Sequence, residues 1–143
     1  MNAFKICMVK ENDVDYPDVK ISNPKTVADL VAKYIGTPDR EIFIVMAVNT
    51  RNDITGINTV SIGSIDTTIS HPREIFKFAI LANAASIILA HNHPSGDSTP
   101  SCDDIELTKR LQKAGEILGI DVLDHIILGN EGRYLSMKDR GLF

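Results

Sequence analysis

The stretch LAHNHPSGDSTPSCDD, residues 89–104, joins the end of an apolar run to the start of a helical pattern through a turn rich in proline and glycine. It holds two of the four histidines of the chain, His91 and His93. If the run SIILAHNH (86–93) is a buried strand, side chains two residues apart share a face, so both imidazoles project together while Asn92 points the other way. Proline cannot continue a strand ladder, and glycine accepts positive φ. The sequence therefore predicts a strand, a sharp turn and a returning helix.

The start of that helix carries a cap signal. Ser101 and Asp104 fit the Ser-x-x-Asp variant of a capping box, with the hydroxyl at the N-cap and the carboxylate three residues on. The helix should bury one face, because apolar side chains recur at helical spacing, and it should end at a glycine. These residues are Leu107, Leu111, Ala114 and Leu118, followed by Gly119.

Strand-like and helix-like patterns alternate along the rest of the chain, which is typical of a mixed α/β domain. One helix should begin at Asn23-Pro24 and end at Gly36. A second should begin after His71, which precedes a first-turn proline and caps the helix, and should bury Phe76, Ala79 and Ile80. We expect further strands over residues 4–9, 41–50, 54–62, 121–128 and 133–137, with the GNEG segment (129–132) as a hairpin turn.

Size and composition favour a single globular domain over residues 1–143. The chain is 43% hydrophobic and 24% charged, close to the average for soluble domains. No apolar run approaches the roughly 20 residues that a membrane span requires. Lys5, Lys10 and Glu11 interrupt the segment in which a signal peptide would be apolar, so we expect a cytoplasmic protein.

Charge and cysteine content narrow the function classes. The formal net charge of −4 provides no electrostatic footprint for the phosphates of DNA, so DNA association has no support from charge. The two cysteines, Cys7 and Cys102, are far apart and form no Cys-x-x-Cys pair, so a disulfide framework is not expected.

Two histidines and a carboxylate suggest a metal site. Capping alone explains Ser101 and Asp104, and packing alone explains a single histidine at a strand end. Together, however, His91, His93 and Asp104 make the three-ligand set of a hydrolytic zinc ion whose fourth position is left for water. The sequence thus predicts one Zn²⁺ per chain.

Hydrolysis also needs a group that takes a proton from water and delivers it to the leaving group. Glu41, at the start of the buried strand EIFIVMAVNT, could face inward, although a solvated position in a loop would also explain it. Glu74 competes, but the helix dipole already accounts for an acidic residue in a first turn. Ser101 could donate its hydroxyl to the developing oxyanion.

These residues resemble a known pattern. HNHPSGDSTPSCDD contains His-x-His, seven residues, Ser, two residues and Asp, which is the JAMM motif of JAB/MPN metalloproteases. The resemblance implies zinc ligands at His91, His93 and Asp104, a transition-state donor at Ser101 and a general base at Glu41. The segments 71–97, LGIDVLDHIILG (118–129) and YLSM (134–137) are similar to the RadC family, and the likeness runs from about residue 26 to the C-terminus.

The family likeness implies a mixed-sheet JAB/MPN domain, a cytidine-deaminase-like α/β sandwich with zinc at strand ends. Longer RadC members carry a helix-hairpin-helix region ahead of this domain, which the roughly forty residues before Glu41 do not supply. The family label of DNA repair therefore has no residues here to support DNA contact. The implied activity is hydrolysis of a peptide or isopeptide bond in a peptide or protein substrate.

Other interpretations remain at this stage. The letters HNH suggest an HNH nuclease, but that motif spreads its residues over a hairpin and a helix, and acidic residues surround this one. Thiol chemistry is a second alternative, because Cys102 lies in a first helical turn, a position where the helix dipole favours the thiolate. His125 could replace Asp104 as third ligand, or it could be a structural residue paired with Asp124 or placed behind the metal. A scaffold without catalysis is the third class, and it usually lacks a complete ligand set.

Overall fold

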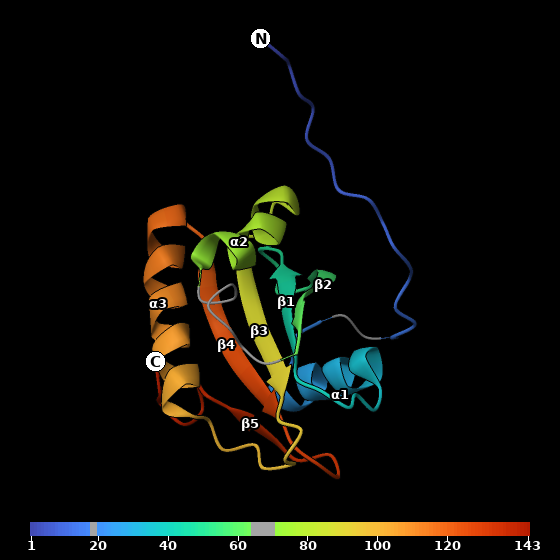
Figure 1. Cartoon of the computed structure of the whole chain (residues 1–143), viewed down its shortest axis with the longest axis vertical. Helices are drawn as coiled ribbons and strands as arrows, with labels where there is room; N and C mark the ends of the chain where they lie inside the picture. The colour runs from blue at the N-terminus through green and yellow to red at the C-terminus, as the bar shows by residue number, and fades with distance from the viewer. Residues whose placement is uncertain (18–19, 64–70) are drawn as a thin grey trace.

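The computed structural model describes residues 1–17, 20–63 and 71–143 (Figure 1). Eight helices and strands follow one another in the described residues. They are α1 (Pro24–Ile35), β1 (Ile42–Val48), β2 (Ile54–Ile62), α2 (Pro72–Leu81), β3 (Ser86–Asn92), α3 (Cys102–Leu118), β4 (Asp121–Leu128) and β5 (Tyr134–Ser136). The expected mixed α/β class is confirmed.

The strands form one mixed sheet in the order β2-β1-β3-β4-β5. β1 pairs with β2 and β3 in antiparallel fashion, β3 and β4 run parallel, and β5 returns antiparallel to β4. A parallel pair needs a long crossover, and α3 supplies it between β3 and β4. The loop from β3 into α3 therefore leaves one end of the sheet, where the histidines lie.

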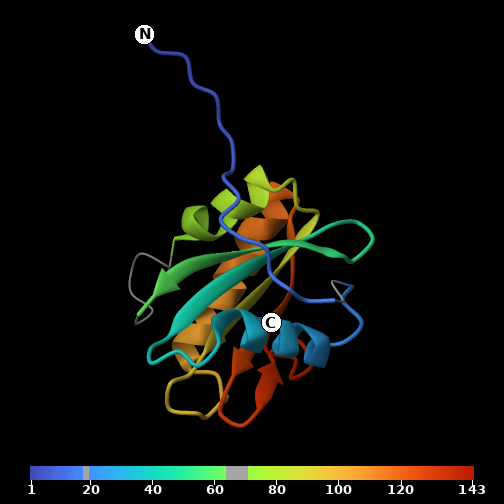
Figure 2. The ribbon, with the colours of Figure 1, turned by 90° about the vertical axis from the view of Figure 1, so that its right-hand side faces the viewer.

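Helices cover both faces of the sheet, as Figure 2 shows with α1 on the near side and α3 behind. The core beneath α1 contains alternate residues of the central strands, including Ile44, Ile88 and Ile126. The intervening residues, such as Val45 and Leu89, pack against α2 and α3. The three layers follow from the two-residue period of strands that are apolar on both faces.

The predicted helix ends are confirmed. The Asn23 side chain accepts a hydrogen bond from the N–H of Thr26, and proline occupies the first turn of α1. Ser101 and Asp104 make both bonds of a capping box at α3. Gly119 ends α3 with φ 73°, a left-handed conformation that glycine adopts without the strain of a Cβ.

Several details of the expected packing are wrong. Residues 4–9 are not a strand: they pair with nothing in the described part of the chain, and Phe4 and Val9 are 87% and 88% exposed. A strand pattern needs a partner edge, and this segment extends away from the body (Figures 1 and 2). Ile80 and Leu118 lie near the C-terminal ends of α2 and α3 and are exposed.

Two smaller points concern helix α2 and membranes. His71 stands at the N-cap of α2 as expected, but its side chain makes no capping hydrogen bond. Within residues 1–17, 20–63 and 71–143, no helix is both long and apolar enough to cross a bilayer.

Candidate metal centre

The pairing of β1 with β3 places a carboxylate beside the two histidines. Phe43 is opposite His91 in this antiparallel pair, so Glu41, two residues earlier, lies on the same face at the level of His93. The backbone carbonyl of Glu41 accepts a hydrogen bond of 2.7 Å from the N–H of Gly63, just after β2. Glu41 is thus held at one end of the sheet, between the neighbouring strands β2 and β3.

Asn92 points away from the histidines, as the strand period predicts. Its side-chain oxygen accepts from the N–H of Ile42 at 2.7 Å, and its amide donates to the carbonyl of Arg40 at 3.1 Å. These bonds tie the end of β3 to the start of β1. They therefore help to fix Glu41 against the histidines.

The fourth residue comes from the first turn of α3. The N–H of Ser101 donates to Asp104 Oδ2 at 2.9 Å, and the N–H of Asp104 donates to Ser101 Oγ at 3.0 Å. Asp104 Oδ2 also lies 3.2 Å from His93 Nε2, and Oδ1 lies 3.4 Å from His91 Nε2. The Asp104 carboxylate therefore both closes the capping box and faces the histidines as a candidate ligand, and one role does not exclude the other.

Glu41, His91, His93 and Asp104 form a group whose ligand atoms all lie within 4.8 Å of one another. The Nε2 atoms of His91 and His93 are 3.0 Å apart, and Glu41 Oε1 is 3.6 Å from His91 Nε2. Two ligand atoms bound to a tetrahedral zinc at about 2.05 Å are about 3.3 Å apart. The spacing of these four side chains fits a small divalent cation.

Proton placement on His93 supports that fit. Its Nδ1 lies 2.7 Å from the backbone carbonyl of Asp97, and a carbonyl can only accept, so Nδ1 carries the proton. In the neutral ring Nε2 then holds a lone pair. That lone pair faces the Asp104 carboxylate and His91 Nε2, so electron-rich atoms meet at a point where a cation can lie between them.

Buried charge shapes the acidity of Asp104, whose side chain is only 4% exposed. Burial raises the pKa of its carboxyl, but the hydrogen bond and positive charge of His91 in its protonated form, together with the N–H of Ser101, outweigh that effect and hold the pKa well below its usual range. Asp104 is therefore an anion at neutral pH. A metal-binding carboxylate must be in this state.

His125 lies behind His91 and outside the four-residue group. Its Nε2 is 2.7 Å from His91 Nδ1, so it contacts the ring edge that points away from Asp104. Burial keeps the pKa of His125 well below its ordinary value, and a protonated His91 would act in the same direction, so the ring is neutral. Asp124 does not pair with that ring; it accepts instead from Ser136 Oγ and the N–H of His125.

Two other residues considered from sequence lie elsewhere. Glu74 forms an ion pair with Lys77 at 3.0 Å in the first turns of α2, and Lys77 lowers the pKa of its carboxyl. Cys102 is exposed and free at the start of α3. Neither belongs to the group that surrounds the Nε2 atoms.

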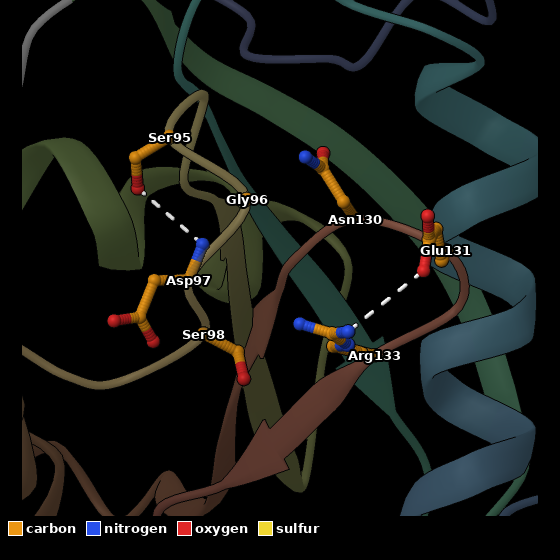
Figure 3. Close-up of a pocket in the computed structure, with 7 residues that line it drawn as sticks. All are labelled: Ser95, Gly96, Asp97, Ser98, Asn130, Glu131 and Arg133. Atoms are coloured by element: carbon orange, nitrogen blue, oxygen red, sulfur yellow. Dashed lines mark hydrogen bonds and ion pairs between the residues drawn. The ribbon is translucent and has the colours of Figure 1, made fainter.

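Two hollows adjoin the loop that follows β3. The first, about 470 Å³, lies between the loop and the β4–β5 turn (Figure 3) and is lined by Ser95, Gly96, Asp97, Ser98, Asn130, Glu131 and Arg133. The second, about 360 Å³, extends from His93 and Pro94 to the end of α1. His93 itself lines the second hollow, whereas the first is lined by Asp97, whose backbone carbonyl holds His93.

Sequence inspection missed Thr108, which is fully buried in α3 between Asp104 and His125. A threonine four residues after the motif's aspartate is an ordinary helix residue by sequence. The signal for it was weak, namely a polar side chain on a face whose other residues are Leu107 and Leu111. Its hydrogen bond to the Asp104 carbonyl lies within α3, whereas its hydrogen bond to His125 Nδ1 appears only when α3 packs on β4.

Comparison with known proteins gives a consistent result. The family model described as a RadC-like JAB domain matches residues 21–142. The UPF0758 protein of Moorella thermoacetica is 53% identical over 122 residues, 85% of this chain and 53% of the relative. That of Methanosarcina mazei is 46% identical over 139 residues, 97% of this chain and 60% of the relative. The chain thus spans little more than half the length of these curated relatives.

Proposed function

The chain belongs to the family of RadC-like JAB domains, and from this premise we propose that it is a zinc-dependent hydrolase of JAMM type that cleaves a peptide or isopeptide bond. One observation carries the proposal. The side chains of Glu41, His91, His93 and Asp104 converge within 4.8 Å, although they come from three separate elements of the fold. Such a set combines nitrogen and carboxylate ligands in the way that zinc hydrolases do.

His91, His93 and Asp104 are the proposed zinc ligands, because they are the more buried members and their geometry is fixed by hydrogen bonds. The side chains of His91 and Asp104 are 0% and 4% exposed. When bound, Zn²⁺ supplies a Lewis acid for the scissile carbonyl and lowers the pKa of a bound water to about 7. The choice of zinc follows from the mixture of imidazole and carboxylate donors.

Glu41 is the proposed general base. Its side chain is 19% exposed, so it can reach both the group of ligands and an approaching substrate. Its carboxylate would take the proton of the attacking water and deliver it to the leaving nitrogen, which must be protonated before the bond breaks. The second carboxylate in the group, Asp104, is less suited to this role because the capping box already occupies Oδ2.

Ser101 is the proposed donor to the oxyanion. Its Oγ accepts from the N–H of Asp104, which leaves the hydroxyl proton available for another partner. Ser101 is exposed at the start of α3, so a substrate carbonyl has access to it. A hydroxyl that helps to cap the helix is already oriented before substrate arrives.

The substrate is proposed to be a peptide or a protein chain. Acidic residues lie close to the ligands in the sequence, among them Asp97 and Asp103, and would repel the phosphates of a nucleic acid. A nuclease or DNA-binding role therefore has less physical support. Since the relatives are nearly twice as long as the matched region, the activity proposed here concerns this domain.

The first experiment replaces the base without removing ligands. Glu41→Gln keeps size and polarity but cannot accept a proton, so we expect zinc content near that of the wild type and peptide hydrolysis reduced by about 10²–10⁴-fold. Zinc is measured by elemental analysis and hydrolysis with a library of quenched fluorescent peptides and isopeptide-linked conjugates. Glu74→Gln is the matched control, because Glu74 lies on α2 outside the group, and it should hydrolyse like the wild type.

Two results would contradict the assignment. Full turnover by Glu41→Gln would show that another group is the base. Purified wild-type protein without bound zinc, which also fails to bind added Zn²⁺, would remove the basis for hydrolysis and favour a scaffold.

A further inference from the structure

A chain of hydrogen bonds connects two of the proposed ligands through the interior of the protein. Thr108 Oγ1 lies 2.7 Å from the backbone carbonyl of Asp104 and 2.6 Å from His125 Nδ1. His125 Nε2 lies 2.7 Å from His91 Nδ1. Thr108 and His125 are both fully buried, so water does not compete for these bonds.

The direction of each bond follows from the number of protons available. The carbonyl of Asp104 can only accept, so the single proton of the Thr108 hydroxyl is donated to it. Thr108 Oγ1 must then accept from His125, which places a proton on His125 Nδ1. The other nitrogen of the neutral His125 ring has a lone pair, and that lone pair accepts from His91 Nδ1–H.

The consequence concerns the opposite edge of the His91 ring. With its proton on Nδ1, neutral His91 presents an unprotonated Nε2 to His93 and Asp104. We propose that Thr108 and His125 are positioning residues that set the tautomer of His91 and so prepare its Nε2 for the metal. The inference rests on the proposed zinc site and deepens it.

Packing holds this relay, the hydrogen-bonded chain of Thr108, His125 and His91, in place. The His91 ring stacks on Phe43 with centroids 5.8 Å apart, and His125 meets the same phenyl ring edge-on at 5.5 Å. Phe43 thus packs against both imidazoles. Among the described residues, every buried polar side-chain atom has a hydrogen-bond partner, so loss of one member leaves another unpaired.

The relay predicts what happens when the hydroxyl is removed. In Thr108→Val the volume is nearly unchanged, but His125 Nδ1–H loses its acceptor. His125 then favours the tautomer with the proton on Nε2, which donates to His91 Nδ1 and moves the His91 proton to Nε2. That proton occupies the position where the metal would bind. Zinc affinity should fall by about 10- to 100-fold, as for other outer partners of histidine ligands.

The test uses the metal-free, ¹⁵N-labelled 143-residue chain and reads ring tautomers from long-range ¹H–¹⁵N spectra. We expect His91 to carry its proton on Nδ1 in the wild type and on Nε2 in Thr108→Val. Zinc dissociation constants are measured with Zn²⁺ alone in competition with a chromophoric chelator. Thr108→Ser keeps the hydroxyl and should restore both the tautomer and the affinity, and thermal unfolding verifies that each variant is folded.

Contradictory results are clear for each measurement. A wild-type His91 with its proton on Nε2 overturns the inference even if no variant folds. A folded Thr108→Val that keeps the wild-type tautomer and zinc affinity while losing stability reduces Thr108 to a structural residue. If tautomer and affinity behave as expected but no peptide bond is cleaved, the proposed function fails and the relay stands.

Discussion

At the scale of single residues, the site depends on side chains with two simultaneous roles. Asp104 closes the capping box of α3 and also faces both histidines. Ser101 caps the same helix and has a free hydroxyl proton. Since a cap and a ligand use different atoms or lone pairs, the two interpretations of this motif are compatible. Mutations here must therefore be measured for stability and activity separately.

Ser101 allows this separation. Ser101→Ala should lower kcat by about 10²-fold if the hydroxyl stabilises the oxyanion, and should lower the free energy of unfolding by about 1 kcal/mol through loss of the cap. Ser101→Gly removes the same hydroxyl, yet glycine at an N-cap costs only about a few tenths of a kcal/mol relative to serine. Peptide hydrolysis and chemical denaturation would be compared for both variants. Unchanged kcat in both would leave Ser101 with the capping role alone.

At the scale of elements, the loop after β3 is held against the β4–β5 turn by close backbone approach. The N–H of Asn130 donates to the carbonyl of Gly96 at 3.0 Å, and the space beside Gly129 is filled by that same carbonyl. The following residue, Asp97, supplies the carbonyl that holds His93. The β4–β5 turn thus supports His93 through the loop that follows β3.

Gly129→Ala tests this support. The new Cβ would collide with the Gly96 carbonyl, a backbone group, so the loop must move; we expect a loss of about 1–3 kcal/mol in unfolding free energy together with weaker zinc binding. Gly132→Ala is the control, since Gly132 lies in the same turn with φ 73° but open space around its Cα. It should cost about 1–2 kcal/mol in backbone strain and leave zinc affinity unchanged. If Gly129→Ala bound zinc with the affinity of the wild type, the loop would be shown to move without displacing His93.

At the scale of the whole molecule, the proposed zinc connects β1, β3 and α3, because the four residues of the group lie in β3 and α3 or directly beside the ends of β1 and β3. A cation that binds only the folded chain stabilises it by mass action. Removing it should therefore destabilise the domain as a whole and not a single loop.

We expect chelation to lower the unfolding free energy by about 4 kcal/mol relative to protein held at a free zinc concentration about 1,000 times Kd. Thermal unfolding with and without chelator gives the shift in Tm. The double variant His91→Ala/His93→Ala should unfold at the same temperature in both conditions. His71→Ala alters an exposed histidine outside the group and should respond to zinc like the wild type. A zinc response in the double variant would place the metal elsewhere.

The sequence by itself determined the local parts of this protein. Strand and helix periods, proline at helix starts and Gly119 at a helix end are properties of neighbouring residues, so they predicted β3, α3 and their connection. The common face of His91 and His93 follows from the two-residue period alone. The prediction of a strand over residues 4–9 was wrong for the complementary reason: a strand pattern is local, but a strand forms only where it can pair with the edge of another strand.

Only the tertiary structure decided how the separate parts meet. Residue types and the family motif nominated Glu41, but the register of Phe43 with His91 places it beside the histidines. The crossover of α3 brings Asp104 to the same point, and its packing on β4 brings Thr108 to His125. These contacts join residues 11 to 50 positions apart. No local period encodes them, because they depend on which strands pair and how the helix lies across the sheet.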